Sequence, residues 1–125
     1  MSDPDDVARR YLAAWNERDQ ARRRALVDAL WTDDAVHVDP IATAAGRAAV
    51  DAVIATAQRQ FPGLGYRAAG SADGHHGVVR LTWELAPEGG PAVIIGVVVL
   101  VTDGARVRAG YGFLDPVPTE AGVDS

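Results

Sequence analysis

Apolar residues recur at helical spacing in three stretches of the chain, which is typical of helices that bury one face. Asp3 and Pro4 suit a helix start, because the aspartate can cap the first turn and proline tolerates the first helical position. The apolar face of that first helix would contain Val7, Ala8, Tyr11, Leu12 and Trp15. The pattern predicts helices from Pro4 to Trp15, from Asp19 to Leu30, and from Arg47 to about Gln60.

From Tyr66 onward, β-type patterns are separated by turn-forming Gly, Pro and Asp residues. Strands are predicted at Tyr66–Ala72, Val78–Ala86, Ala92–Thr102 and Arg106–Leu114, and one earlier strand at Ala35–Asp39. In the second of these late strands, Val79, Leu81 and Trp83 alternate with polar residues and should face inward. The order of elements predicts an α+β fold, with three helices on one side of a mostly antiparallel sheet.

The stretch from Ala92 to Val101 carries no polar side chain on either face of its predicted strand. An antiparallel strand with one solvated face should instead alternate apolar and polar residues. The helices can cover one face, and a second copy of the chain is the simplest cover for the other. We therefore expect a homodimer formed through the sheet.

A polar pair interrupts the strand that precedes Pro40. Because side chains alternate along a strand, His37 and Asp39 share one face while Val36 and Val38 share the other. Proline cannot continue the hydrogen-bonded ladder. The pair therefore marks either a solvated sheet edge or the wall of a pocket with a polar end.

Composition limits the class of protein. A length of 125 residues indicates one domain, which we place at 1–116, followed by a flexible tail at 117–125. A net charge of -5 argues against nucleic-acid binding. No cysteine, signal segment or apolar run of membrane-spanning length is present, which favours a cytoplasmic protein with no membrane partner. The neighbouring His75 and His76 lack a third ligand for a metal.

With these elements in order, the chain resembles the nuclear transport factor 2-like superfamily, and within it the SnoaL-like and ketosteroid isomerase-like proteins. The resemblance covers Val7 to Leu114 and is carried by Arg10–Asn16, Ala29–Ala35 and the Asp39-Pro40 pair. It implies a cone-shaped, strongly curved sheet wrapped around the helices, enclosing a deep apolar pocket. It also implies dimerisation through the sheet.

The resemblance implies roles for three residues. Asp39 matches the aspartate before proline that moves a proton in ketosteroid isomerases, and Tyr11 matches the tyrosine that donates a hydrogen bond to the oxyanion. His37 joins them as a candidate catalytic residue. The second oxyanion donor of those enzymes, a protonated aspartate, has no counterpart, because no carboxylate lies between Glu88 and Asp103. Efficient isomerisation of 3-keto-Δ5-steroids is therefore not expected.

The resulting prediction is a small cofactor-independent enzyme. It would transfer protons on a hydrophobic carbonyl compound, by isomerisation or by an aldol-type cyclisation like that of SnoaL-like polyketide cyclases. An apolar wall should raise the pKa of Asp39. The residues expected to bind the substrate are Trp15, Trp31, Val79, Leu81, Trp83, Val97 and Phe113. Two alternatives remain open at this point: a non-catalytic small-molecule-binding module, and a dimerising platform whose pocket is vestigial.

Overall fold

The computed structural model describes residues 3–115 and contains three helices and seven strands. The helices are α1 (Pro4–Asn16), α2 (Gln20–Leu30) and α3 (Arg47–Gln60), close to the predicted bounds. The strands are β1 (Trp31–Val38), β2 (Thr43–Ala45), β3 (Leu64–Ala68), β4 (Asp73–His75), β5 (Val78–Pro87), β6 (Ile94–Asp103) and β7 (Arg106–Asp115). The tail predicted at 117–125 lies outside the described residues. Within residues 3–115, no helix is long and apolar enough to cross a membrane.

Helices α1 and α2 begin where the sequence provides a capping side chain. The Asp3 carboxylate accepts a hydrogen bond from the backbone N–H of Asp6 at 3.2 Å, and that of Asp19 accepts one from Arg22 at 2.9 Å. Each bond satisfies a donor that the first turn of a helix leaves free. Helix α3 has no such cap and follows Gly46, whose φ is 90°. Glycine reaches this backbone conformation without the strain that a Cβ would cause.

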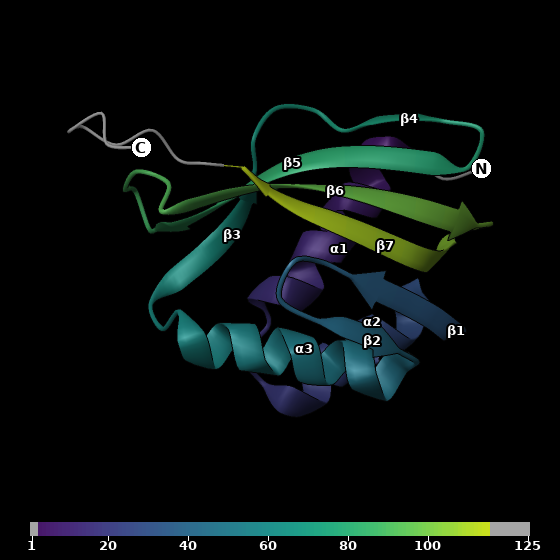
Figure 1. Ribbon diagram of the computed structural model, residues 1–125, viewed down its shortest axis with the longest axis horizontal. Helices are drawn as coiled ribbons and strands as arrows, with labels where there is room; N and C mark the ends of the chain where they lie inside the picture. The colour runs from purple at the N-terminus through teal and green to yellow at the C-terminus, as the bar shows by residue number, and fades with distance from the viewer. Residues whose placement is uncertain (1–2, 116–125) are drawn as a thin grey trace.

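The strands form one curved sheet in the order β2-β1-β7-β6-β5-β3, and β4 pairs with β5 beside this path (Figure 1). Neighbouring strands are antiparallel except β1 and β7, which are parallel. The sheet is therefore mixed. β1 is the first strand in the sequence and β7 is the last. Their pairing therefore brings the Asp39 end of β1 beside the last strand.

Several predicted strand positions were wrong. β1 begins at Trp31, not at Ala35, because Trp31 already pairs with Val107 of β7 ahead of an irregularity in the register. β3 starts and ends earlier than predicted, because it pairs with β5 from Leu64 to Ala68. β2 and β4 lie in segments where the sequence pattern predicted no strand. Both are three-residue strands stabilised by pairing with an edge, which local sequence does not encode.

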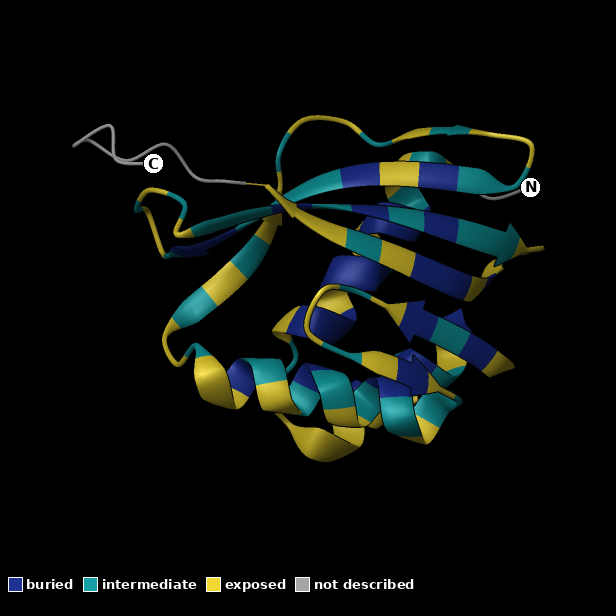
Figure 2. Ribbon diagram, viewed as in Figure 1, coloured by how far each residue is buried: buried dark blue, intermediate teal, exposed yellow. Residues whose placement is uncertain are grey.

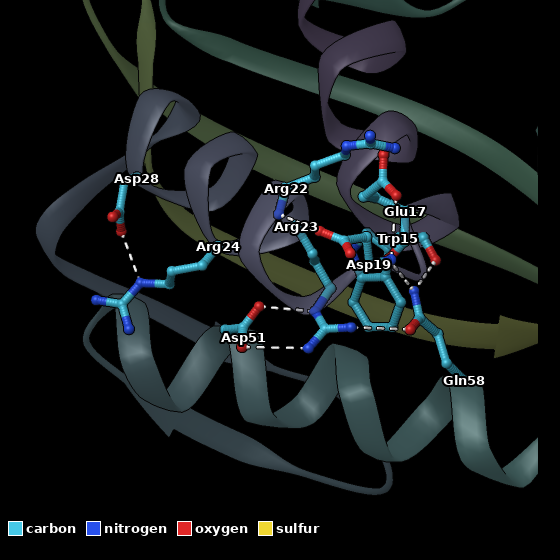
Figure 3. Close-up of polar contacts among 9 residues, drawn as sticks. All are labelled: Trp15, Glu17, Asp19, Arg22, Arg23, Arg24, Asp28, Asp51 and Gln58. Carbon is cyan, nitrogen blue, oxygen red and sulfur yellow. Dashed lines mark hydrogen bonds and ion pairs between the residues drawn. The ribbon is translucent and has the colours of Figure 1, made fainter.

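Buried polar side chains join the three helices where α3 passes α2 (Figure 3). Arg23, only 5% exposed, forms an ion pair with Asp51 of α3 at 2.8 Å and donates to the Gln58 side-chain oxygen at 3.0 Å. The Gln58 amide donates to the carbonyl oxygens of Trp15 and Glu17 at 3.0 and 2.7 Å. We call Arg23, Asp51 and Gln58 the helix clasp. The clasp fixes α3 relative to the end of α1.

Buried and half-buried residues alternate along the middle of β6 (Figure 2), so the two faces of the sheet differ in burial. On β6, Val98 and Leu100 are buried beneath the helices, whereas Val97 and Val99 on the opposite face are only half-buried. The register pairs Val97 with Phe113 of β7, which is 58% exposed. In the single chain the outer face of β6 and β7 is therefore apolar and open to solvent.

We expect two copies of the chain to pair through this outer face, as the pattern of β6 predicts. Replacing Val97 by Arg should shift the protein from dimer to monomer, because the contact would have to bury an unpaired charge. Analytical ultracentrifugation at micromolar concentration measures this directly. The control is Ala48→Arg, which adds the same charge at an exposed position on α3. A wild-type protein that sediments only as a 13.2 kDa monomer would contradict the prediction.

Candidate functional site

A cavity of about 470 Å³ lies between α3 and the inner face of the sheet. Side chains of α3 form one wall, namely the small Ala49, Ala52, Val53, Thr56 and Ala57, and the longer Gln60. The opposite wall contains Trp83, Leu85, Ile94 and Val98 from β5 and β6. Cavities of this size hold ligands of drug-like dimensions, and mostly apolar walls are typical of such sites.

Asp39 and His37 lie together in this cavity. His37 Nε2 is 2.7 Å from Oδ2 of Asp39, and because an ionised carboxylate can only accept, the imidazole is the donor. The other carboxylate oxygen, Oδ1, accepts from the backbone N–H groups of Ile41 and Ala42 at 2.8 and 2.7 Å. The His37 side chain is 2% exposed, whereas that of Asp39 is 20% exposed. Asp39 is therefore the member of the pair that a ligand can reach.

The predicted rise in the pKa of Asp39 was wrong. Burial by itself does raise the pKa of this carboxyl, but hydrogen bonds from His37 and from the N–H groups of Ala42 and Ile41 outweigh burial and lower it. Asp39 lies just after the last residue of β1, where the chain turns back toward β2. That turn supplies the two backbone donors. At neutral pH the carboxylate is ionised and is a weaker base than an unpaired one.

Two tyrosines in the cavity stay protonated. Burial, with a smaller contribution from the negative charge of Asp39, raises the pKa of Tyr11 far above its usual value. Burial and the charge of Asp39 raise the pKa of Tyr66 to about 12, partly offset by Arg18. Both hydroxyl groups can therefore donate a hydrogen bond to a developing negative charge without losing their own proton.

Aromatic rings line the inner side of the cavity in a continuous row. The ring centroids of Trp15 and Tyr66 are 5.3 Å apart, as are those of Tyr66 and Trp83, and both pairs meet edge to face. Trp83 lies directly over Gly96 of the neighbouring strand, where an added Cβ would be 2.2 Å from the indole ring. Gly112 likewise leaves space for Asp39, because a Cβ there would lie 3.2 Å from that of Asp39.

Six of the ten predicted site residues line the cavity: Asp39, His37, Tyr11, Trp15, Trp83 and Phe113. Phe113 lies at the rim, where it is largely exposed. Tyr66 and the wall provided by α3 also line the cavity but were not predicted from the sequence. A stripe of small residues along α3, beside its buried stripe, was the available signal.

The other four predicted substrate-binding residues lie elsewhere, which corrects the prediction. Trp31 is fully buried in the core, packed over Gly110. Val79 and Leu81 face inward as predicted, but at the end of β5 that α1 covers. Val97 points to the outer face, because successive side chains of a strand point to opposite faces and its neighbour Val98 points inward.

Among residues 3–115, no group of three His, Cys, Asp or Glu side chains is arranged to hold a metal ion. The cavity instead presents one carboxylate, one imidazole and two phenols. This set can accept a proton at Asp39 and donate hydrogen bonds from Tyr11 and Tyr66. The arrangement suits acid–base chemistry on a ligand with an acidic C–H bond next to a carbonyl.

Residues 8–110 match the SnoaL-like domain. The chain belongs to the SnoaL-like family. A crystal structure of a candidate isomerase of that family from Agrobacterium tumefaciens is 38% identical, with a TM-score of 0.85 over 89% of this chain and 96% of the other. No curated protein matches the sequence.

More distant structures share the fold of this SnoaL-like protein. One is a candidate SnoaL-like polyketide cyclase from Jannaschia sp. CCS1, with 15% identity and a TM-score of 0.70 over 92% of this chain and 90% of the other. Another is a protein with a ketosteroid isomerase-like fold from Catenulispora acidiphila in complex with trimethylamine, with 19% identity and a TM-score of 0.68 over 85% of this chain and 82% of the other. At these identities the similarity shows the fold alone.

The lowered pKa of Asp39 predicts how its contribution to stability depends on pH. A carboxyl whose pKa is depressed on folding stabilises the protein above its unfolded pKa of about 3.9, and this contribution is lost as the pH falls through the folded value. Asp39→Asn should therefore lower the free energy of unfolding most near neutral pH and progressively less below about pH 4. Urea denaturation across this range measures the difference. Asp103→Asn, at an exposed position, is the control, and an Asp39→Asn deficit that stays constant with pH would contradict the prediction.

The contact between Gly96 and Trp83 predicts a paired effect. Gly96→Ala should destabilise the protein by about 1–3 kcal/mol, because its methyl group would overlap the indole ring. Combining it with Trp83→Leu should recover part of that loss, because the smaller side chain clears the overlap. Denaturation of the two single variants and the double variant tests this. Additive losses in the double variant would show that the two side chains do not meet.

Proposed function

We propose that this SnoaL-like protein is a small enzyme that transfers a proton on a hydrophobic carbonyl compound, by isomerisation or by an aldol-type ring closure. The observation that carries the proposal is the position of Asp39, an ionised carboxylate that is partly exposed inside an otherwise mostly apolar cavity. An ionised carboxylate beside apolar walls destabilises a protein unless it is paired or hydrogen-bonded. Carboxylates in such clefts are therefore often functional.

The Asp39 carboxylate keeps one free acceptor position for a proton. A carboxylate offers about four acceptor positions, and the hydrogen bonds from His37, Ile41 and Ala42 occupy three of them. The remaining position can take a proton from the carbon next to a bound carbonyl group. His37 acts as a positioning residue, because its bond to Oδ2 fixes the orientation of the carboxylate.

Tyr11 and Tyr66 would stabilise the enolate that forms when the proton leaves. The resemblance to ketosteroid isomerases predicted one oxyanion donor, Tyr11. No second donor lies on β6, whose inward residues Val98 and Leu100 are apolar. Tyr66 supplies a second neutral donor within the same cavity, from β3. Removing one such donor typically slows a reaction by a factor of about 10² to 10³.

Non-catalytic binding is the second candidate function. Three hydrogen bonds already stabilise the buried charge of Asp39. Its lowered pKa also makes it a weaker base than the raised pKa expected from the sequence would have done. A protein that only binds a hydrophobic molecule could use the same cavity. Asp39 would then serve to stabilise the turn after β1 through its hydrogen bonds. The two functions differ in whether a bound ketone exchanges its α-protons.

Proton exchange tests the proposal without knowledge of the natural substrate. In D2O, the wild-type protein should accelerate deuterium incorporation at the α-carbon of 1-tetralone, a bicyclic ketone, as followed by NMR. Asp39→Asn should abolish the acceleration, because the amide cannot accept the proton. Tyr11→Phe and Tyr66→Phe should each reduce it by a factor of about 10 or more.

Binding must be measured for the same variants by calorimetry. Gln20→Arg, at an exposed position on α2 away from the cavity, should leave both binding and exchange unchanged. Exchange no faster than in buffer, with 1-tetralone bound to the wild-type protein, would favour the binding module. Retention of full activity in Asp39→Asn would reject Asp39 as the base.

A further inference from the structure

Within the described part of the chain, no arginine lines the cavity. The sequence has twelve basic residues, all arginine, so basic side chains are available on many surfaces of the protein. Among the described residues that line the cavity, Asp39 is the only carboxylate, and His37 is hydrogen-bonded to it. The described lining residues therefore offer a bound ligand one carboxylate and no arginine.

Two arginines approach the cavity wall from outside and are committed to other partners. Arg18 donates to the carbonyl oxygens of Gln58 and Leu64, at 3.3 and 2.8 Å. Arg59 donates to the Thr56 hydroxyl at 3.2 Å on the exposed side of α3. Each guanidinium therefore spends part of its donor capacity on partners in the chain, and neither side chain is among the residues that line the cavity.

An anionic ligand group would thus meet two penalties in this cavity. It would lose hydration against apolar and aromatic walls without gaining a countercharge. It would also approach the ionised Asp39, which repels a like charge most strongly where water is partly excluded. An uncharged ligand of the same shape incurs neither penalty.

We propose that the cavity selects uncharged carbonyl compounds and rejects those whose buried portion carries a carboxylate or a phosphate. The inference rests on the proposed function for the identity of the ligand as a carbonyl compound, and adds the charge that the ligand must have. The charge filter follows from the lining residues and would operate whether or not the bound ketone reacts.

Matched ligands test the filter. We compare 1-tetralone-6-carboxamide with 1-tetralone-6-carboxylate, which have nearly the same shape but differ in charge, and include 1-tetralone as the parent ketone. Isothermal titration calorimetry should show both uncharged ketones bound at least about tenfold more tightly than the carboxylate. The difference should persist at about 0.5 M salt, where the net charge of the whole protein is screened.

A gain-of-function variant tests the cause. Gln60 lines the cavity wall at an exposed position of α3, so Gln60→Arg should add a countercharge without disturbing the core. This variant should bind the carboxylate at least about fivefold more tightly than wild type, and any gain for the carboxamide should be smaller than that for the carboxylate. Gln20→Arg makes the same substitution away from the cavity and should change neither affinity.

The outcomes separate the filter from the proposed chemistry. Equal affinity of the wild-type protein for carboxylate and carboxamide, or no binding of either uncharged ketone, would overturn the filter. A carboxylate affinity that rises equally in Gln60→Arg and Gln20→Arg would show that overall charge, not the cavity, sets the preference, and would also overturn it. Selective binding of uncharged ketones without α-proton exchange would instead support the filter and reject the enzyme.

Discussion

The cavity depends on the helix clasp formed by Arg23, Asp51 and Gln58. Helix α3 packs beside β1 and β2, but the cavity separates it from β5 and β6, so it cannot rely on close apolar packing against the sheet along its whole length. The clasp instead fastens it to α2 and to the carbonyl groups at the end of α1. Because a buried arginine is stable only when it is paired and hydrogen-bonded, these contacts strongly favour one position of α3. That position keeps the wall of small side chains apart from the aromatic wall of the sheet.

The same principle applies on a smaller scale at Asp39. A carboxylate inside a mostly apolar cavity is stable here because the turn after β1 provides two backbone donors and His37 provides a third. These bonds fix the carboxylate in space and lower its pKa together, so that accurate positioning and base strength oppose each other. The site therefore provides an ionised, well-oriented acceptor at neutral pH, and the two phenols provide donors that stay protonated.

The two faces of the sheet have separate tasks. On the inner face, glycines opposite Trp83 and beside Asp39 make room for large or functional side chains. On the outer face, valines of β6 and the aromatic residues of β7 form an exposed apolar surface away from the core, and Phe113 of this surface also reaches the cavity rim. The strict alternation of strand side chains allows one ten-residue strand, β6, to contribute to both tasks.

Local sequence determined the helices, their caps, the inward face of β5 and the pairing of His37 with Asp39, because each depends on residues a few positions apart. Tertiary structure decided the rest. The parallel pairing of β1 with β7 places Asp39 beside Gly112, more than 70 residues away in the sequence, and the approach of β3 to α1 brings Tyr66 into the site. Alternation alone could assign Val97 and Val98 to opposite faces but could not say which face the helices cover. The pKa of Asp39 was misjudged for the same reason, since apolar neighbours are visible in a sequence whereas backbone donors supplied by a turn are not.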